Sequence, residues 1–159
     1  MKVRKATKSD WPQIKKIYQL GINTEIATFE SQTPKDFETW ISKLDKENTF
    51  VCEKNNLVLG WVALSKVSSR ATYKGVGEIS IYVDPNYHNK KVGETLYKKL
   101  EDSALETGYW TIQAQLFTAN KASKAFFKKQ EFRQVGVRKK IGNLNGEWID
   151  NFLYEKNFN

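Results

Sequence analysis

Gly77-Glu-Ile-Ser-Ile-Tyr-Val83 is the stretch that decides the fold, together with the loop Asn86-Tyr-His-Asn-Lys-Lys91 and the apolar positions between Val92 and Leu100. Apolar and polar residues alternate in the first stretch, whereas apolar residues recur at roughly every fourth position in the last one. This change of period predicts a strand, a short loop and a helix that begins near Lys91. Backbone N–H groups without partners at the start of a helix, beside the lysines of the loop, favour the binding of an anion.

The length and composition indicate one globular domain that spans residues 1–159. Hydrophobic residues make up 40% of the chain and aromatic residues 13%, which argues against disorder, and 28% charged residues suit a water-exposed surface. The net charge of +8 favours anionic partners. A nucleic acid, an acidic membrane surface and a polyphosphate cofactor all fit this charge, so it does not choose between them.

Cysteine usage and the N-terminal residues suggest a cytoplasmic protein. Cys52 is the only cysteine, so the chain can form no internal disulfide, and its apolar neighbours predict a small buried side chain in a strand. Residues 1–8 lack the apolar run of a signal peptide, and no stretch of about eighteen consecutive apolar residues occurs. We therefore expect neither export nor a membrane span.

The first third of the chain carries one strand signal and several helix signals. A strand is expected at 3–6, and a helix should begin at Ser9-Asp10-Trp11-Pro12, where capping side chains precede a proline, and end at Gly21. Residues 23–30 are expected to be helical at first and then a loop. A further helix is expected from near residue 33 to Lys46. Its apolar face would carry Phe37, Trp40, Ile41 and Leu44.

The remainder of the chain carries mainly strand signals. Residues 49–53 and 57–67 predict a hairpin, because Asn55 and Asn56 between them tolerate the positive φ of a tight turn. A polar loop at 68–75 precedes the strand at Gly77, and the helix after that strand should end at Thr107-Gly108. Strands at 110–117, 132–140 and 148–154, with a helix at 120–129, complete the pattern. It predicts an α+β fold, a mixed sheet with helices on its faces.

Four short motifs, in this order, resemble those of one group of enzymes. They are Ala27-Thr-Phe-Glu30, Arg70-Ala-Thr-Tyr73, Glu78-Ile-Ser-Ile-Tyr-Val83 and Gly146-Glu-Trp-Ile-Asp150. Together with the order of the predicted elements, they make the whole chain similar to the GNAT N-acetyltransferases, and among these to the phosphinothricin and methionine sulfone or sulfoximine acetyltransferases. The resemblance implies a mixed seven-stranded sheet with helices on both faces, splayed after its fourth strand.

The same resemblance implies acetyl-CoA as the cosubstrate and no metal. The thioester end would enter the gap in the sheet, and the pantetheine arm would pair with the backbone of Ile81, Tyr82 and Val83 as a neighbouring strand would. Asn120 would hydrogen-bond this arm, although asparagine is also a favourable helix N-cap. The phosphates would lie on the loop and the first helical turn, at Asn89, Lys90, Lys91, Val92, Gly93 and Glu94.

The chain departs from the pattern of this group at several positions. Only Gly93 of the pyrophosphate motif remains, because His88 replaces a glutamine or arginine and Lys91 replaces a glycine. A side chain at Lys91 could crowd the approach of a phosphate to the backbone, although a lysine also binds phosphate as a point charge. Phe127 stands where many members have a tyrosine that protonates the leaving thiolate, so a general acid stays unassigned. Glu131 replaces a glycine, and a different exit from the helix is expected there.

Glu78 is the expected route for the proton lost by the acceptor amine. A carboxylate is a weak base for an ammonium group, so transfer through a water molecule is expected rather than direct abstraction. A structural role, as an ion-pair partner of Arg70 or Lys74, is the alternative. The expected oxyanion donor is a backbone N–H near Ile81. Alternation places Glu78, Ser80 and Tyr82 on one face of the strand and Ile79, Ile81 and Val83 on the other.

Arg70, Tyr73, Phe29 and Glu30 are the expected acceptor-binding residues. The guanidinium group of Arg70 matches a planar carboxylate, and Tyr73 would bind a polar oxygen of the acceptor side chain. Phe29 and Glu30 would close the pocket. As alternatives, Phe29 is a core aromatic residue and Arg70 a solvated loop residue.

The sequence thus predicts an acetyl-CoA-dependent N-acetyltransferase that acts on the α-amine of a small amino acid, such as phosphinothricin or methionine sulfone or sulfoximine. The resemblance also implies a homodimer. Two alternatives stay open: acetyl transfer to another amine, or a non-catalytic module that senses acyl-CoA or binds nucleic acid. Because the chain carries no recognisable nucleic-acid motif, we expect neither nucleic acid nor a membrane as a partner.

Overall fold

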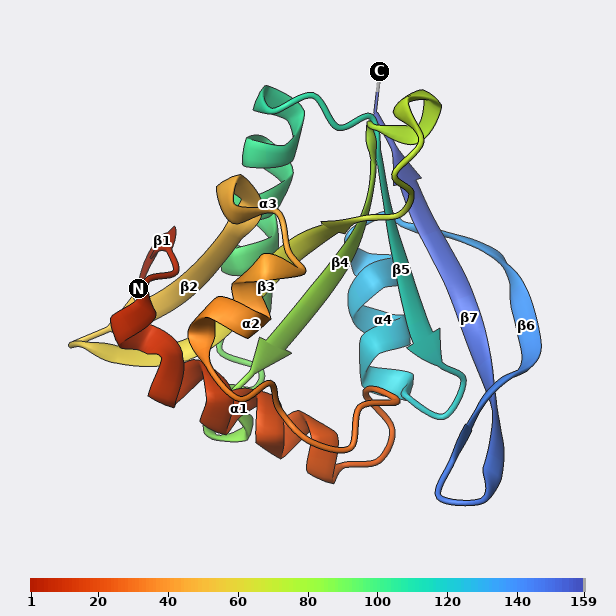
Figure 1. Ribbon diagram of the computed structural model, residues 1–159, viewed down its shortest axis with the longest axis horizontal. Coiled ribbons are helices and arrows are strands. Elements are labelled where there is room, and N and C mark those ends of the chain that lie inside the picture. The colour runs from red at the N-terminus through yellow and green to blue at the C-terminus, as the bar shows by residue number, and fades with distance from the viewer. Residues whose placement is uncertain (159) are drawn as a thin grey trace.

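The computed structural model describes residues 1–158, in which one seven-stranded sheet lies between two pairs of α-helices (Figure 1). The strands are β1 Lys2–Lys5, β2 Thr49–Lys54, β3 Leu57–Lys66, β4 Val76–Val83, β5 Thr111–Phe117, β6 Arg133–Leu144 and β7 Glu147–Asn157. The α-helices are α1 Trp11–Asn23, α2 Phe37–Ser42, α3 Val92–Glu106 and α4 Lys121–Lys129. The strands lie in the order β1-β2-β3-β4-β5-β7-β6, which confirms the predicted mixed α+β fold.

The sheet opens between β4 and β5. β4 pairs antiparallel with β3 over Gly77–Val83, but it pairs in parallel with β5 only where Val76–Glu78 face Thr111–Gln113. Beyond Glu78 the two strands diverge, as Figure 1 shows. The splay expected after the fourth strand is therefore present, and Glu78 is the last residue of β4 before it.

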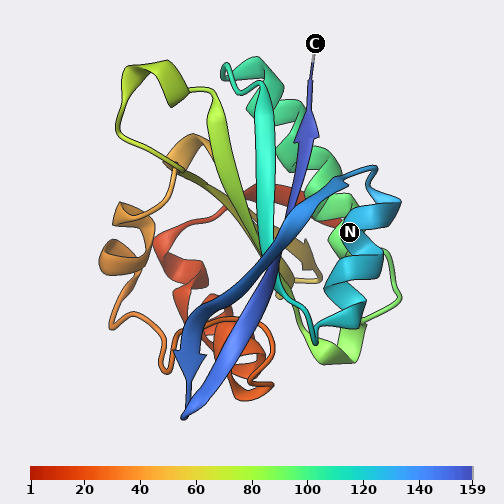
Figure 2. The same ribbon diagram turned by 90° about the vertical axis from the view of Figure 1, so that its right-hand side faces the viewer.

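Each face of the sheet has its own apolar core. Figure 2 shows α1 and α2 on one side of the sheet and α3 and α4 on the other. On the α3 side, Leu96 and Leu100 pack on alternate residues of the central strands, such as Ile79 and Ile112. On the α1 side, the core is largely aromatic. It includes Trp40, Trp61, Ile14 and Ile17, with Trp11, Tyr18, Phe37 and Tyr82 packed against it.

Two helix predictions need correction. α1 continues past Gly21 to Asn23, and its end is followed by Glu25 with a φ of 60°, so residues 24–30 are not helical. Gly21 permits close packing rather than ending the helix, because a Cβ there would lie 2.5 Å from the ring of Tyr82. The second predicted helix is shorter than expected. α2 begins after the N-cap Asp36, ends at Ser42, and is followed by a separate 3-10 turn at Lys46–Asn48.

The predicted hairpin of β2 and β3 is confirmed, and the last two strands, β6 and β7, are longer than expected. Asn55 and Asn56 have φ angles of 52° and 65° between β2 and β3. β6 runs to Leu144, beyond the expected end at residue 140, and its register to β7 shifts twice. At the second shift, the carboxylate of Asp150 accepts a hydrogen bond from the backbone N–H of Lys140 at 2.8 Å. Asp150, the last residue of the fourth motif, therefore stabilises the irregular part of the β6–β7 pairing.

An ionic network joins β1, the start of α1 and β2. Arg4 donates two hydrogen bonds of 2.8 Å to Asp10, and its Nε lies 3.1 Å from the carboxylate of Glu53. Asp10 is 4% exposed and also accepts from the backbone N–H of Thr7. Burial alone would raise the pKa of Asp10, but these hydrogen bonds outweigh it and hold the pKa below its ordinary value.

The structure also bears on the expected burial of Cys52 and on the expected absence of a membrane span. The Cys52 side chain is fully buried in the α3-side core, as predicted, and burial raises the pKa of its thiol. None of the helices within residues 1–158 combines the length and the apolar character needed to cross a membrane.

Candidate active site

The backbone of β4 directs alternate residues toward the opening. On the β3 side, the carbonyl of Val76 accepts from the N–H of Val67, and the N–H of Asp84 donates to the carbonyl of Leu59. On the β5 side, the carbonyl of Gly75 accepts from the N–H groups of Trp110 and Thr111. In an antiparallel pair, alternate residues direct both main-chain groups to the same neighbour. Even-numbered residues of β4 therefore bond to β3, and odd-numbered ones face β5. Beyond the paired region, Ile81 presents its N–H and its C=O to the opening.

This alternation separates the three residues expected to pair with pantetheine. Ile81 and Val83 face the opening, while the backbone of Tyr82 is directed to Trp61 of β3, its partner in the register. The Val83 carbonyl lies 3.2 Å from a ring nitrogen of His88. The edge of β4 that remains free is thus centred on Ile81, which is also the expected oxyanion donor.

The N-terminus of α3 lies at the open end of β4. Lys91 is its N-cap, with a φ of 65°, and its side chain is exposed. The residue thus adopts the left-handed conformation that glycine favours. Gly93 lies where α3 meets α4, and a Cβ there would lie only 3.1 Å from the ring of Phe126. The N–H groups of the first turn, at Val92, Gly93 and Glu94, precede the first possible intrahelical bond.

Lysines border this helix start on two sides. The ammonium group of Lys90 lies 5.5 Å from the ring centre of Tyr87, in the loop before α3. Glu94 forms an ion pair with Lys129 of α4, and this contact lowers the pKa of Glu94. The carboxylate of Glu94 is therefore neutralised, so it opposes an incoming anion less than a free carboxylate would. Asn89, with a φ of 60°, forms part of the same tight loop.

Asn120 has two structural contacts. Its side-chain oxygen accepts from the backbone N–H of Ser123 at 3.1 Å and caps α4, as predicted. Its Nδ2 donates to the carbonyl of Ile26 at 3.3 Å. Asn120 therefore ties the start of α4 to the loop after α1, and the second hydrogen of its amide stays available to a ligand.

Phe127 and Glu131, which depart from the family pattern, lie at the end of α4 and just after it. Phe127 is 5% exposed and packs edge to face against Phe126 and Phe132. The departure at Glu131 does not prevent a sharp helix exit. Glu131 adopts a φ of 68°, and Phe132 N–H returns to the carbonyl of Phe127 at 3.0 Å.

Glu78 lies at the closed end of the opening. Its Oε1 accepts two hydrogen bonds, from Nε2 of Gln113 at 2.9 Å and from Nε2 of Gln115 at 2.7 Å. Neither Arg70 nor Lys74 forms an ion pair with Glu78 in the described part of the chain, so the structure does not contain the ion pair that the alternative interpretation expected. The two glutamines come from β5, the strand from which β4 diverges.

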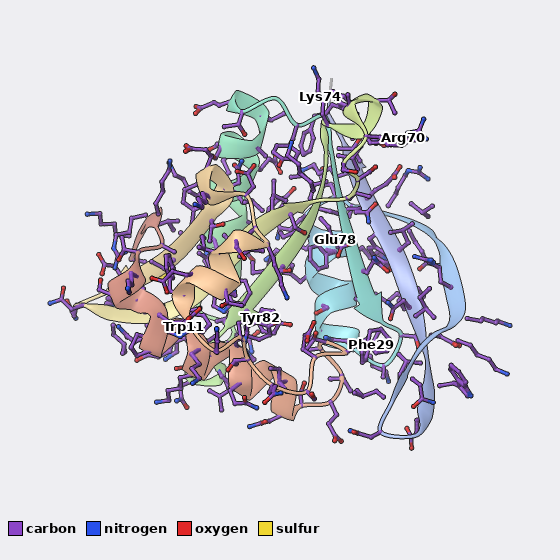
Figure 3. The ribbon with its side chains drawn as sticks, in the orientation of Figure 1. Trp11, Phe29, Arg70, Lys74, Glu78 and Tyr82 are labelled. Carbon is purple, nitrogen blue, oxygen red and sulfur yellow. The ribbon has the colours of Figure 1, made fainter. Side chains whose placement is uncertain are left out.

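The four predicted acceptor-binding residues lie in two groups. Figure 3 shows Arg70 and Lys74 near the first residues of β4, Glu78 further along the strand, and Phe29 beside the far end of β5. The guanidinium group of Arg70 lies 5.6 Å from the ring centre of Tyr73 in the same 3-10 turn. Arg70 and Tyr73 are both exposed. Glu78 therefore lies between the Arg70 group and the Phe29 group.

Phe29 holds the loop after α1 against β5 and β6. Its ring centre lies 4.7 Å from that of Phe117, and a Cβ at Gly142 would lie 2.6 Å from the Phe29 ring. At the tip of the β6–β7 hairpin, Nδ2 of Asn145 donates to Glu25 at 3.0 Å. Phe29 is 37% exposed, so it both packs and presents part of its ring to solvent.

Tyr18 and Tyr82 lie close enough to Glu30 for its charge to affect the pKa of both hydroxyl groups. The rings of Tyr18 and Tyr82 lie 5.0 Å apart on the α1 side of the sheet. Burial raises the pKa of Tyr18 to about 12, with a smaller contribution from the charge of Glu30. Burial also raises the pKa of Tyr82 above its ordinary value. Both hydroxyl groups are protonated at neutral pH, as they would be at the ordinary pKa of tyrosine.

Several residues of this region were not found by sequence reasoning. Gln113, Gln115 and Phe117 alternate along β5 and share the face that carries Glu78. The alternation itself was the signal that could have singled them out. Asn151 of β7 lies opposite Phe117, is 4% exposed, and has no hydrogen-bond partner for its Oδ1 within residues 1–158. Trp148, by contrast, is 63% exposed.

A sheet that opens beside a free strand edge, with a helix N-terminus and lysines at the open end, fits an acyltransferase that uses a nucleotide thioester. The acetyltransferase (GNAT) domain family matches residues 3–153, and the chain belongs to this family. It is therefore a GNAT N-acetyltransferase, as predicted. Members of this family take the acetyl group from acetyl-CoA.

Individual relatives agree with this assignment. Phosphinothricin N-acetyltransferase of Alcaligenes faecalis is 31% identical over 166 residues, which cover 99% of this chain and 82% of the relative. Ribosomal-protein-alanine N-acetyltransferase from Brucella melitensis is 26% identical in sequence. Its crystal structure superimposes with a TM-score of 0.90 over 99% of this chain and 100% of that one.

A third protein shares the fold and was solved with its cosubstrate. The phosphinothricin acetyltransferase of Sinorhizobium meliloti, in complex with acetyl-CoA, superimposes with a TM-score of 0.88. It is 24% identical, and the match covers 99% of this chain and 88% of that chain. This likeness confirms the seven-stranded GNAT fold that the sequence predicted.

Proposed function

We propose that this chain transfers the acetyl group of acetyl-CoA to the α-amine of a small amino acid or analogue, of the phosphinothricin or methionine sulfone or sulfoximine type. One observation carries the proposal: the opening between β4 and β5 has Glu78 at its closed end and the start of α3 at its open end. A thioester nucleotide lying along Ile81 would then have its phosphates at α3 and its acetyl group near Glu78.

Different residues of the opening and of the start of α3 would bind different parts of the cosubstrate. The first-turn N–H groups of Val92, Gly93 and Glu94 and the ammonium groups of Lys90 and Lys91 would hold the diphosphate, with Asn89 shaping the loop. Ile81 and Val83 would pair with the pantetheine arm, and the free amide hydrogen of Asn120 would bind the same arm. A metal has no place in this scheme.

The reaction then proceeds by direct transfer. The acceptor ammonium loses one proton through water to Glu78, and its neutral nitrogen attacks the thioester carbon. The N–H of Ile81 stabilises the oxyanion as the C–N bond forms. The C–S bond breaks, and the leaving thiolate takes up, through water, the second proton released by the nitrogen. The products are the N-acetyl amine, the CoA thiol and one proton passed to solvent, and Phe127 takes no part.

The acceptor would bind on the α1 side of the sheet, where Glu78 projects. Arg70 and Tyr73 would bind its carboxylate and a polar oxygen from one end of β4, and Phe29 and Glu30 would close the pocket from the other end. Arg70 is free to move toward an acceptor, because its only close contact among the described residues is with the ring of Tyr73 and its own turn. The acceptor would bridge the two groups.

An assay of thiol release from acetyl-CoA tests this proposal. The acceptors are phosphinothricin, methionine sulfone, methionine sulfoximine, their decarboxylated amines and a polyamine. We expect Glu78→Gln to lower kcat about a hundredfold or more. Arg70→Ala should raise KM for the carboxylate-bearing acceptors and not for the decarboxylated amines. Glu106→Gln, an exposed substitution at the end of α3, serves as the control.

Two results would contradict it. Equal thiol release by the wild type and Glu78→Gln would remove Glu78 from the proton route. A higher kcat/KM for a polyamine or a peptide N-terminus than for all the amino acids would place the chain among the acetyltransferases of other amines.

We further propose that the chain works as a cytoplasmic homodimer. Support comes from β6, an edge strand of the sheet on which Val135 and Val137 are 43% and 45% exposed. Exposed apolar side chains on a sheet edge favour pairing with a second copy. Sedimentation equilibrium should give the mass of two chains, and Val137→Lys should shift it toward one. A monomer at all concentrations would refute the dimer.

A further inference from the structure

Two amides hold one oxygen of Glu78. Gln113 lies directly opposite Glu78 in the parallel pair, and Gln115 lies two residues further along the same face of β5. Both donate from Nε2 to the same atom, Oε1. The other carboxylate oxygen, Oε2, takes part in no hydrogen bond within residues 1–158. The bond from Gln115 also crosses the point at which the backbone pairing of β4 and β5 ends.

A second carboxylate on the same face shows a different arrangement. Glu155 of β7 lies opposite Gln113 on its other side, and Arg133 of β6 lies opposite Glu155. Arg133 and Glu155 form an ion pair at 2.5 Å. The row across the sheet therefore contains one carboxylate neutralised by a cation and one, Glu78, held only by neutral donors.

Neutral donors and a cation have different effects on a carboxylate. A cation orients the group but also cancels its charge, which weakens its attraction for an ammonium proton. An amide N–H orients the group and leaves its net charge in place. Two such donors on Oε1 restrict the rotamer of a side chain with three rotatable bonds, and they leave Oε2 without a donor among the described residues.

We infer that Gln113 and Gln115 are positioning residues that present the free oxygen of Glu78 to the acceptor amine or its relay water. This inference rests on the proposed function, in which Glu78 takes the proton. Both donors lie on β5, so the hydrogen bonds that orient Glu78 also join β4 to β5 at the point where the two strands begin to diverge. Neither glutamine needs to touch the acceptor or acetyl-CoA.

Methionine substitutions test the inference, because methionine is close to glutamine in length and has no N–H to donate. We expect Gln113→Met and Gln115→Met each to lower kcat about tenfold, and the double variant about a hundredfold, with KM for acetyl-CoA unchanged. Gln115→Lys restores a donor but adds a cation, so it should not restore kcat. Gln19→Met is the control, because within residues 1–158 the side-chain amide of Gln19 bonds only to Asn23 on the same helix.

The same substitutions in a Glu78→Ala background separate positioning from other effects. If the glutamines act through Glu78, Gln113→Met and Gln115→Met should cause no further loss of kcat there. An equal loss in both backgrounds would show that they act independently of Glu78. Unchanged kcat in the first series would show that the base needs no positioning.

A measurement without turnover keeps the inference testable if the proposed reaction is wrong. The side-chain amide signals of Gln113 and Gln115 in a 15N–1H spectrum should move in Glu78→Ala and stay unchanged in Glu106→Gln. Absence of thiol release with every amine, together with shifted amide signals, would refute the enzymatic proposal and leave the hydrogen-bonded group. Unshifted signals would refute the positioning itself.

Discussion

Lys91 and Glu131 hold left-handed backbone conformations at the two bends beside the candidate cosubstrate site. Their φ angles are 65° and 68°, although neither is a glycine. A residue with a Cβ adopts this region at a cost of roughly 1–2 kcal/mol. The surrounding hydrogen bonds impose the conformation in both cases. Thr95 N–H bonds to the carbonyl of Lys91, and Phe132 N–H bonds to that of Phe127.

Glu131→Gly should therefore stabilise the chain. Glycine removes the conformational cost but loses more entropy on folding, which leaves a gain of about 0.5–1 kcal/mol. The weak contact of Glu131 with Lys156, at 4.0 Å and with Glu131 85% exposed, offsets little of it. Thermal unfolding should show a rise in Tm of about 1–4 °C. Lys128→Gly, inside α4, should lower the stability by about 0.5–1 kcal/mol, and a fall with both variants would contradict the argument.

Gly21→Ala should destabilise the chain, against the usual preference of helices for alanine. Helix propensity alone would favour alanine by about 1 kcal/mol. The new Cβ would lie 2.5 Å from the Tyr82 ring, which is stacked on Trp61 at 4.9 Å and cannot easily yield. We expect a net loss of about 1–2 kcal/mol in urea unfolding. Gly136→Ala, with nothing within 4 Å of its Cβ, should change the stability little, and a gain at Gly21 would show that Tyr82 yields.

At the scale of elements, local patterns predicted the strands and the longer helices, and long-range contacts explain the errors. The alternation in Gly77–Val83 and the asparagines of the first hairpin act within a few residues, so the sequence reveals them directly. Gly21 was misread as a helix end because its partner, Tyr82, lies far along the chain. α2 has only six residues, yet its apolar side chains and that of Leu44 in the turn after it all reach the α1-side core. Their contacts with this core do not require a longer helix.

The ionic network between β1, α1 and β2 makes a prediction about pH. The pKa of Asp10 in the folded chain lies below its ordinary value of 3.8, so folding favours the ionised form. Its contribution is therefore complete above about pH 4 and is lost as the pH falls through the lower folded value. Asp10→Asn should be less stable than the wild type at pH 7 by about 2 kcal/mol, because Arg4 loses a charged partner.

Urea unfolding between about pH 7 and pH 2 measures the stability difference at neutral pH and its loss on acidification. The wild type should lose stability more steeply on acidification than Asp10→Asn, so the two curves should converge at low pH. Asp102→Asn, which breaks an exposed pair with Lys98, should change the stability by no more than about 0.5 kcal/mol. Parallel curves for the wild type and Asp10→Asn would mean that this carboxylate does not carry the pH dependence.

At the scale of the whole molecule, the candidate site combines elements that lie far apart in the sequence. The motif residues Glu78, Arg70 and Phe29 were identified from the sequence because each lies in a short recognisable pattern. The glutamines that hold Glu78 come from 35 and 37 residues later, and they meet it only because β5 lies beside β4. Sequence reasoning thus found the motif residues and missed the neighbours that the topology brings to them.

The opening in the sheet predicts how the whole molecule should respond to acetyl-CoA. If the pantetheine arm replaces a missing strand, the amide of Ile81 should gain protection from hydrogen exchange on binding. The amides of Ser80 and Tyr82, which face β3, should be protected already. At a free concentration about a hundredfold above Kd, acetyl-CoA should also stabilise the fold by about 2.7 kcal/mol.

Adenosine 3′,5′-bisphosphate, which carries phosphates without the pantetheine arm, separates the two ends of the site. It should compete at the start of α3 and leave the exchange of the Ile81 amide unchanged. Protection of Ile81 by this nucleotide as well would mean that the opening closes by itself once α3 is occupied. In that case the free edge of β4 would report a movement of the sheet rather than a strand-like contact with the arm.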